Sequence, residues 1–307
     1  MEHKENDLVK KRFVFLILHY NTIEETKKCV QSIFERVKVN YDIVIVDNGS
    51  TNNTGEELKE CYKDKSQIKI IINEKGYGFS KGNNIGFKYI KENLNPDYII
   101  MINSDIEIIL DNFCEIIDKE FQVSKFAVLG PRILLPRNRI DDFKFEMITL
   151  KEAKKELTKK KIAYFADKIY LYYLLKFFMV LPRAIKKIFF DLGLMEEKVD
   201  DKSKRREMVA LQGSCLIFSK EYIEKFDGID EKTDFYCEEY FLFLKLMDNN
   251  LLSVYNPYLI VYHNENATTN KTYSSKKKKR KFTLSNIIKS DKELVNELKM
   301  REVNKII

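Results

Sequence analysis

Apolar runs alternate with stretches of helical periodicity along the first 130 residues of the chain. The runs read RFVFLIL, DIVIVD, IKIII and DYIIMIN, and helical periodicity lies between them at residues 24–36, 55–62 and 80–93. Near-continuous apolar runs predict strands buried on both faces, and their alternation with helices predicts βαβ units. The pattern therefore predicts an α/β fold with a mostly parallel, doubly wound Rossmann-like sheet and helices on both faces.

Polar clusters interrupt this pattern where three of the strands end. In a doubly wound sheet, ligands bind at the carboxyl ends of the strands, near the point where the strand order reverses. The same residue types also form ordinary turns, so each cluster taken alone allows either interpretation. The clusters are His19-Tyr20-Asn21, Asp47-Asn48-Gly49-Ser50 and Asn103-Ser104-Asp105.

The third cluster places two oxygen ligands at one strand exit. Asp105 follows the buried run DYIIMIN, and Asn103 precedes it by two residues. Carboxylate and amide oxygens suit a hard divalent cation, which in turn binds diphosphates. A cation site at this strand end is therefore one hypothesis, and a simple turn is the other.

The second half of the chain departs from the alternating pattern. Residues 141–207 are rich in Lys and Glu, then aromatic, then charged again, which predicts a helical insertion. The pattern resumes with the strand GSCLIFS, a helix at 238–250 and the strand LLSVYN. We therefore expect one domain over residues 1–270, followed by a basic tail at 271–307.

Six consecutive basic residues in this tail, 276–281, predict a solvated, mobile run that also suits an anionic lipid surface. No nucleic-acid partner is expected.

The insertion contains the segment KKKIAYFADKIYLYYLLKFFMVLPRAIKKIFF at residues 159–190. It has no charge-free apolar run of the ~18 residues that a membrane-spanning helix needs. Basic residues flanking aromatic and aliphatic ones are typical of a helix in the lipid headgroup layer, and also of a helical hairpin packed on the protein's own core. Both interpretations stay open.

Composition narrows the class of protein. The 307 residues are 44% hydrophobic and 33% charged, which is typical of a globular protein, and 54 Lys and Arg against 47 Asp and Glu give a net charge of +7. This mild excess favours a phosphorylated ligand or an anionic membrane surface. The five cysteines are scattered, and the N-terminus is polar, so we expect a cytoplasmic protein. The basic aromatic segment at 159–190 would make it peripheral at the inner face of the plasma membrane.

Six segments in a fixed order carry a resemblance to a known family. They read FLILHYNTIEETKKCVQSI, YDIVIVDNGSTNNT, NEKGYGFSKGNNIGF, YIIMINSDIEI, LQGSCLIFSKEYIEKFDGIDE and FYCEEYFLFLKL. This series resembles the family-two nucleotide-sugar glycosyltransferases, especially their rhamnosyltransferase-like branch. The resemblance covers about residues 13–265 apart from the insertion, and it implies the GT-A fold.

The resemblance implies a set of donor-binding residues. Asp47 matches the position that recognises the base or ribose, although it also has the sequence context of a loop cap. Lys81 lies where it would neutralise phosphate charge, although a surface lysine is the commoner case. The donor-binding residues implied are Asn21, Asp47, Gly76, Lys81, Asn84, Asn103, Asp105 and Gly213.

The family's metal motif has acids at both ends, whereas this chain has Asn103 at the first position. The resemblance implies Mg²⁺ or Mn²⁺ held by Asp105, waters and the substrate phosphates. His263, which follows a predicted strand, matches a position that completes the metal site in related enzymes. An ordinary hydrogen-bonded role is the alternative for His263.

The resemblance places the general base in the segment FYCEEYF. Glu239 aligns with the catalytic acid residue of the family, and Glu238 with the acid before it. Two acids in the first turn of a helix also stabilise the helix dipole without any catalytic role. The implied reaction is a single in-line displacement with inversion, in which Lys81 or Arg132 offsets charge on the departing diphosphate.

The implied function is transfer of rhamnose or a hexose from a dTDP- or UDP-sugar to a hydroxyl of a growing cell-surface polysaccharide or lipid-linked glycan. A non-catalytic sugar-nucleotide or lipid-binding subunit is the first alternative, because the acidic motif is incomplete. A nucleotidyltransferase is the second alternative, and it is disfavoured because HYNTIEET lacks a Gly- and Arg-rich loop after the first strand.

Overall fold

A computed structural model describes residues 8, 10–141, 143, 145–168, 201–264 and 275–304. The chain divides into two compact units. The first comprises Met1–Met147 with Lys202–Tyr273, and the second comprises Ile148–Asp201 with Ser274–Ile307. The structure thus groups most of the expected insertion with the expected tail, two segments that no pattern in the sequence connects.

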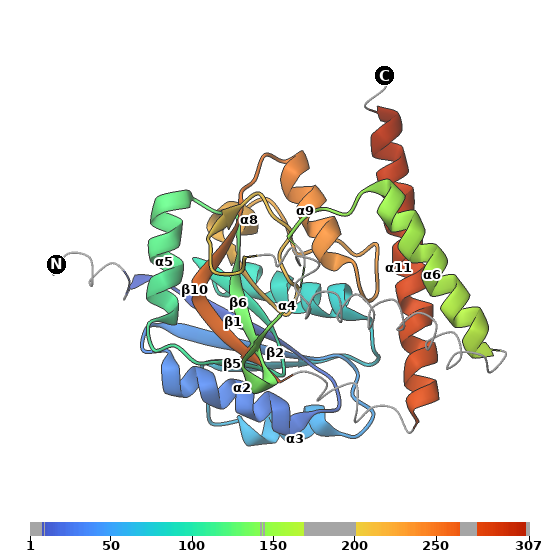
Figure 1. Cartoon of the computed structure of the whole chain (residues 1–307). Coiled ribbons are helices and arrows are strands. Elements are labelled where there is room, and N and C mark those ends of the chain that lie inside the picture. The colour runs from blue at the N-terminus through green and yellow to red at the C-terminus, as the bar shows by residue number, and fades with distance from the viewer. Residues whose placement is uncertain are drawn as a thin grey trace. The chain divides into compact units, whose positions relative to one another are not determined.

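The first unit contains one large sheet with the strand order β3-β2-β1-β4-β9-β6-β10-β5, in which β7 also pairs with β6 and β8 with β10 (Figure 1). The strands are β1 (Phe13–His19), β2 (Tyr41–Asp47), β3 (Ile68–Ile72), β4 (Tyr98–Asn103), β5 (Ile106–Ile108), β6 (Val128–Leu135), β7 (Arg139–Ile140), β8 (Arg206–Glu207), β9 (Cys215–Ser219) and β10 (Ser253–His263).

The strand directions confirm the predicted fold. Strands β3, β2, β1 and β4 are parallel, as are β6 and β10. Strand β9 lies antiparallel between β4 and β6, and β5 pairs antiparallel with β10. The helices of this unit are α2 (Ile23–Arg36), α3 (Thr54–Cys61), α4 (Phe79–Asn93), α5 (Phe113–Ser124), α8 (Lys220–Ile223) and α9 (Glu238–Asp248), with a 3-10 turn at Pro136–Asn138.

Two hydrophobic cores lie on opposite faces of the sheet. Alternate residues of β1 enter different cores, because successive side chains of a strand point to opposite faces. Phe15 packs with the apolar stripes of α2 and α5, whereas Leu16 packs with those of α4 and α9. The sheet is therefore covered on both faces, which explains the near-continuous apolar runs in the sequence.

Close packing of α4 on the sheet positions the loop before it. A Cβ atom added at Gly86 would lie 2.3 Å from Leu16 Cδ1 and 2.7 Å from Val46 Cγ2. Only glycine lets the helix approach β1 and β2 this closely. The first turn of α4 consequently lies over the carboxyl ends of these strands.

The second unit contains α6 (Leu150–Lys168) and α11 (Lys276–Asn304). Arg280 in the first turns of α11 binds Asp167 at the end of α6, so the helices run antiparallel as a hairpin (Figure 1). Buried residues such as Leu157 and Leu284 form its apolar seam. The expected mobile basic run at 276–281 is corrected here, because it forms the start of a long helix.

No helix in the described part of the chain is long and apolar enough to span a membrane. Residues 169–190 of the aromatic segment lie outside the described residues, and residues 159–168 belong to α6.

Candidate donor and catalytic site

Asp47 ends β2 with its carboxylate buried among loop residues. Its Oδ1 accepts hydrogen bonds from the Ser50 backbone N–H at 3.1 Å and from the Ser50 hydroxyl at 2.5 Å. A Cβ atom added at Gly55 would lie 2.1 Å from Asp47 Oδ2, so α3 begins directly against this carboxylate. The loop-capping role of Asp47 is therefore present in the structure, while contact with a nucleoside stays a prediction.

His19 is buried beside Asp47 at the end of β1. Its Nδ1 lies 2.7 Å from Thr26 Oγ1 and its Nε2 lies 2.9 Å from Thr54 Oγ1. Burial lowers the pKa of His19 to about 4, although the nearby charge of Asp47 acts in the opposite direction. A neutral imidazole thus links β1 to the first turns of α2 and α3.

Asn21 ties the loops after β1 and β2 together. Its backbone is left-handed, with φ of 60°, and its N–H donates to Ser50 Oγ at 2.9 Å. Its side-chain oxygen accepts from the Thr51 N–H at 2.9 Å. These contacts show a bracing role, and the predicted contact of Asn21 with the nucleotide stays a prediction.

The glycine-rich loop is fixed to the end of β2 by Asn48. The Asn48 side chain donates from Nδ2 to the Gly78 carbonyl at 2.9 Å and accepts from the Tyr77 N–H at 3.0 Å. Gly76 lies beside the Asn48 carbonyl, where a Cβ atom would be 3.3 Å from it. Lys81 places its Nζ 5.3 Å from the centre of the Tyr77 ring. The loop thus presents cationic and aromatic groups near two strand ends.

Asp105 and His263 meet at the edge of the sheet. Antiparallel pairing of β5 and β10 sets His263 opposite Ile106, and His263 Nε2 lies 3.2 Å from Asp105 Oδ1. The Asp105 carbonyl also accepts from the Asn264 N–H at 2.9 Å. The structure therefore brings together the two residues predicted to hold a metal ion.

The side chains of Asp105 and His263 suit a divalent metal ion that the protein binds weakly. Within the described ranges, no group of three or more His, Cys, Asp or Glu side chains is arranged around a common point. Asn103 uses its backbone N–H to bond the Ser214 carbonyl at 2.9 Å. One carboxylate and one imidazole fit Mg²⁺ or Mn²⁺ whose other ligands are waters and substrate phosphates.

Glu238 and Glu239 begin α9 after a left-handed turn at Tyr236 and Cys237, with φ of 70° and 68°. Glu238 Oε1 accepts from the Tyr236 N–H at 2.8 Å, so this side chain closes the turn. Burial, followed by the charge of Glu238, raises the pKa of Glu239 to about 8. A carboxyl group with such a pKa is suited to general-base chemistry near neutral pH.

Asn84 faces the loop before α9. Its Oδ1 accepts from the Ile229 N–H, and its Nδ2 donates to the Ile229 carbonyl, each at 2.8 Å. Nδ2 also donates to Glu231 Oε1 at 2.9 Å. The side chain predicted to contact the donor therefore holds the loop of residues 228–231 in this structure.

A second contact joins the two loops. The Phe79 N–H donates to the Asp234 carbonyl at 2.6 Å. Gly78 has φ of +86°, and a Cβ atom there would lie 2.8 Å from the same carbonyl. Sequence reasoning marked residues 230–235 as a loop but did not single out Asp234, because the contact uses its backbone carbonyl and side-chain patterns carry no signal for such a contact.

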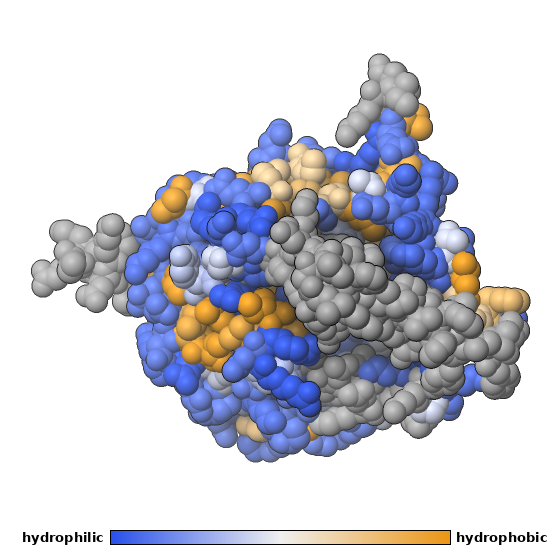
Figure 2. Space-filling view, in the orientation of Figure 1, coloured by the Kyte–Doolittle hydropathy of each residue, from blue (hydrophilic) through white to orange (hydrophobic). Residues whose placement is uncertain are grey.

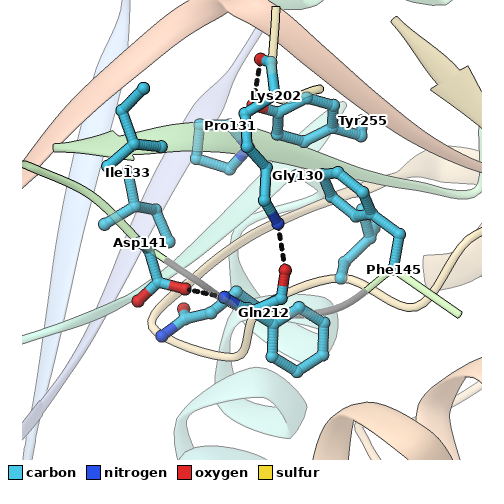
Figure 3. Close-up of a pocket in the computed structure, with 11 residues that line it drawn as sticks. Gly130, Pro131, Ile133, Asp141, Phe145, Lys202, Gln212 and Tyr255 are labelled. Carbon is cyan, nitrogen blue, oxygen red and sulfur yellow. Dashed lines mark hydrogen bonds between the residues drawn. The ribbon is translucent and has the colours of Figure 1, made fainter. Parts of the chain in front are cut away.

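A small cavity is lined by residues of β6, β7 and β10 and of the segments that follow β7 and precede β9 (Figure 3). Lys202 enters it, with its Nζ bonded to the Phe143 carbonyl and 3.8 Å from the centre of the Phe145 ring. Asp141 accepts from the Phe143 N–H at 2.7 Å, and its charge contributes to the raised pKa of Glu239. Sequence reasoning also did not identify Asp141, because Asp141 and Glu239 are far apart in the sequence and no local pattern relates them.

Gly213 follows Gln212, one of the residues lining this cavity. A Cβ atom added at Gly213 would have no neighbour within 4 Å. The position is therefore open, and its predicted role in donor binding stays a prediction.

The mostly parallel sheet with helices on both faces is the architecture of the GT-A fold. The sequence matches Glycosyl transferase family 2 over residues 15–189, more than half of the chain. The protein belongs to this family.

Two relatives indicate the range of similarity. The chain is 24% identical over 225 residues to the low-salt glycan biosynthesis hexosyltransferase Agl10 of Haloferax volcanii, covering 73% of this chain and 58% of that protein. It is 28% identical over 103 residues to the glycosyltransferase GlyG of Streptococcus pneumoniae, covering 34% of this chain and 33% of GlyG. The chain thus spans little more than half the length of Agl10.

Solved structures of TarS from S. aureus share the fold. TarS residues 1–349 superimpose with a TM-score of 0.50 at 13% identity, covering 90% of this chain and 70% of TarS 1–349. The same fragment in complex with UDP-GlcNAc gives a TM-score of 0.51 at 14% identity, covering 91% and 66%. At this identity the likeness establishes the architecture alone.

Proposed function

We propose that this protein is an inverting glycosyltransferase that moves a sugar from a nucleoside-diphosphate donor to a hydroxyl of a glycan or lipid-linked acceptor. The pairing of Asp105 with His263 at the sheet edge is the observation that carries the proposal. Membership of the family supports the reaction class. Glu239, with its raised pKa at the start of α9, supplies the basic group that the reaction needs.

The donor is proposed to be a UDP- or dTDP-sugar. The TarS structures with UDP and UDP-GlcNAc support a uridine nucleotide, and the description of Agl10 as a hexosyltransferase supports a hexose. The motif series supports rhamnose as the other candidate sugar. Asp47, at the end of β2, is the group proposed to accept hydrogen bonds from the base or ribose.

The chemistry assigned to this chain is a single displacement. Glu239 accepts the proton of the acceptor hydroxyl as its oxygen bonds to the anomeric carbon, and the bond from that carbon to the diphosphate breaks on the opposite face. Lys81 and Arg132 are proposed to offset the charge on the departing diphosphate. Arg132 lies on β6 opposite Ile260, and its Nε is buried with no hydrogen-bond partner among the described residues.

A bound Mg²⁺ or Mn²⁺ would add Lewis-acid stabilisation of the diphosphate, with Asp105 and His263 as its protein ligands. Imidazole is a softer ligand than carboxylate, so His263 favours Mn²⁺ over Mg²⁺. The proposed location is the cytoplasm, peripheral at the inner face of the plasma membrane, where a lipid-linked acceptor is available.

A non-catalytic sugar-nucleotide-binding subunit is the second candidate. Asn103 in place of the first acid of the metal motif is the observation that favours it. Such a subunit would bind the donor through Asp47 and the glycine-rich loop and would release no nucleoside diphosphate.

The test compares wild type with Glu239→Gln in an assay of nucleoside-diphosphate release from UDP- and dTDP-sugars with Mn²⁺. We expect the variant to lose release while it still binds the donor in a thermal-shift assay. Glu57→Gln, which neutralises an exposed acid in the first turn of α3, is the matched control. Equal release by wild type and Glu239→Gln would refute the base assignment, and absence of release by wild type would support the binding subunit.

A further inference from the structure

The positive charge of the protein is concentrated in its helical unit. Residues 148–201 and 274–307 contain 23 Lys and Arg against 12 Asp and Glu, whereas the whole chain has 54 against 47. The helical unit thus has a net charge of +11 and the whole chain +7, which leaves the sheet unit net negative. The net positive charge of the chain therefore comes from the helical unit alone.

Within this unit the charge is polarised along the α6–α11 hairpin. One end, here called the hairpin tip, consists of residues 159–168 and 276–286, which hold ten basic residues and a single acid. The rest of the two helices, residues 150–158 and 287–304, holds seven basic and six acidic residues. The ion pair between Asp167 and Arg280 brings the two segments of the tip together.

The single acid of the tip is used inside the hairpin. Asp167 is buried, and its Oδ1 accepts from Arg280 Nε at 2.8 Å. This pair fastens α11 to α6. Lys278 and Lys281 are exposed, and neither forms an ion pair with any residue that the structure describes.

These two lysines line an open groove within the hairpin. Its other lining residues offer two hydroxyls, an amide and two aromatic rings. Ammonium, hydroxyl and amide groups on one surface suit a phosphate group, for which lysine acts as a point charge. The complete lining is Tyr164, Lys278, Lys281, Phe282, Ser285 and Asn286.

Bulky apolar side chains are exposed at the same tip. Phe165 is 62% exposed, Ile162 50% and Phe282 37%. In Figure 2 the visible surface of the hairpin is mostly hydrophilic, and hydrophobic residues are exposed near the C-terminal end of α6. Basic residues combined with exposed Phe and Ile are typical of helices that lie in the lipid headgroup layer. Binding to a nucleic-acid backbone requires only the positive charge, so it does not explain the exposed apolar side chains.

We propose that the hairpin tip binds the surface of an anionic lipid bilayer. A lipid phosphate occupies the groove beside Lys278 and Lys281, and Phe165 and Phe282 enter the headgroup layer. Each lysine at such a surface strengthens binding roughly fivefold, and salt weakens this contribution. The inference goes beyond the proposed reaction and does not depend on it.

The experiment measures sedimentation of the full-length protein with phosphatidylcholine vesicles that contain or lack phosphatidylglycerol. We expect binding only to the anionic vesicles, and roughly fivefold weaker binding for each lysine removed in Lys278→Ala/Lys281→Ala. Lys292→Ala/Lys299→Ala removes the same charge from exposed positions at the other end of α11 and is the matched control. An equal loss in both double variants would overturn the assignment to the tip.

Variants of exposed apolar residues distinguish insertion into the headgroup layer from electrostatic attraction to it. Phe165→Ala should weaken binding at high salt as well as at low salt, whereas Val303→Ala, which truncates an exposed residue far along α11, should not. Equal binding to neutral vesicles, or duplex RNA that displaces the protein from anionic vesicles, would overturn the proposal. Unfolding midpoints confirm that each variant is folded, and nucleoside-diphosphate release without vesicles tests the reaction separately.

Discussion

His263 Nε2 lies 3.2 Å from Asp105 Oδ1, although the two residues belong to distant parts of the sequence. Their meeting depends on β10, which pairs with β6 on one side and β5 on the other. The antiparallel register between β5 and β10 sets His263 opposite Ile106, the residue that follows Asp105. The pair is therefore a product of strand register.

Asp105→Asn should reduce nucleoside-diphosphate release by about 100-fold or more, because it removes the only carboxylate of the pair that would support the diphosphate charge. Initial rates of nucleoside-diphosphate release, measured over a Mn²⁺ titration, would show this reduction. Asp111→Asn, which changes an exposed acid that pairs with Arg36, is the matched control and should leave the rate within about twofold. An Asp105→Asn enzyme with the wild-type Mn²⁺ dependence would contradict the metal role.

The transfer rate should rise with pH and level off above about pH 8. Glu239 acts only when it is deprotonated, and its pKa is raised to about 8, so the active form accumulates as the pH rises through that value. A profile of kcat against pH measures this midpoint. A rate that is flat between pH 6 and pH 9 would exclude Glu239 as the base.

Glu238→Gln should move the midpoint of that profile to lower pH. Burial is the largest cause of the raised pKa of Glu239, and the charge of Glu238 is the next. Removal of this charge makes ionisation of Glu239 easier, while burial continues to raise the pKa of Glu239. An unchanged midpoint, with folding confirmed by circular dichroism, would show that the two carboxyl groups do not interact.

The free energy of unfolding should fall as the pH drops from about 6.5 to about 4. The folded state holds His19 neutral because burial lowers its pKa to about 4, whereas the unfolded chain binds a proton near the ordinary value of 6.5. The unfolded state thus binds more protons in this window, so stability decreases with decreasing pH and the loss is complete below about pH 4. Urea unfolding midpoints would show a smaller pH dependence for His19→Gln than for wild type.

Gly228→Ala should destabilise the loop before α9. Gly228 has φ of +142°, and an added Cβ atom would lie 2.1 Å from Asn84 Oδ1. Strain of this kind costs on the order of 1–3 kcal/mol, and it would displace the amide that holds residues 229–231. Gly213→Ala is the control, because its Cβ atom meets nothing within 4 Å, and its unfolding midpoint should match wild type. Donor affinity of Gly213→Ala separately tests the predicted donor contact.

Local patterns in the sequence were sufficient for the parallel half of the sheet. The run from Phe13 to His19 is apolar at every position but the last, and it forms a strand buried on both faces. Its helices α2 and α4 begin and end within a residue or two of the predicted ranges. These features depend on propensity and periodicity over a few neighbouring residues, so they can be read without knowledge of the fold.

Residue roles that depend on tertiary contacts were harder to predict from the sequence. Asn84 lies in the predicted glycine-rich segment, yet its amide bonds the loop at Ile229. Asp141 and Asp234 act on Glu239 and on the glycine-rich loop through contacts that have no local signature. Such contacts join distant parts of the chain, and a single sequence does not encode their distances in any short pattern.

The sequence by itself determined the four parallel strands β1 to β4, the helices between them and the family, because hydrophobic periodicity and an ordered series of motifs are properties of the linear chain. Tertiary structure alone decided that His263 faces Asp105, that Asn84 braces the loop before α9, and that the basic run at 276–281 becomes a helix. In each case the outcome depends on packing between segments that are far apart in the sequence. For the basic run, apolar residues of α11 bury against α6, and this gain outweighs the mutual repulsion of its exposed lysines.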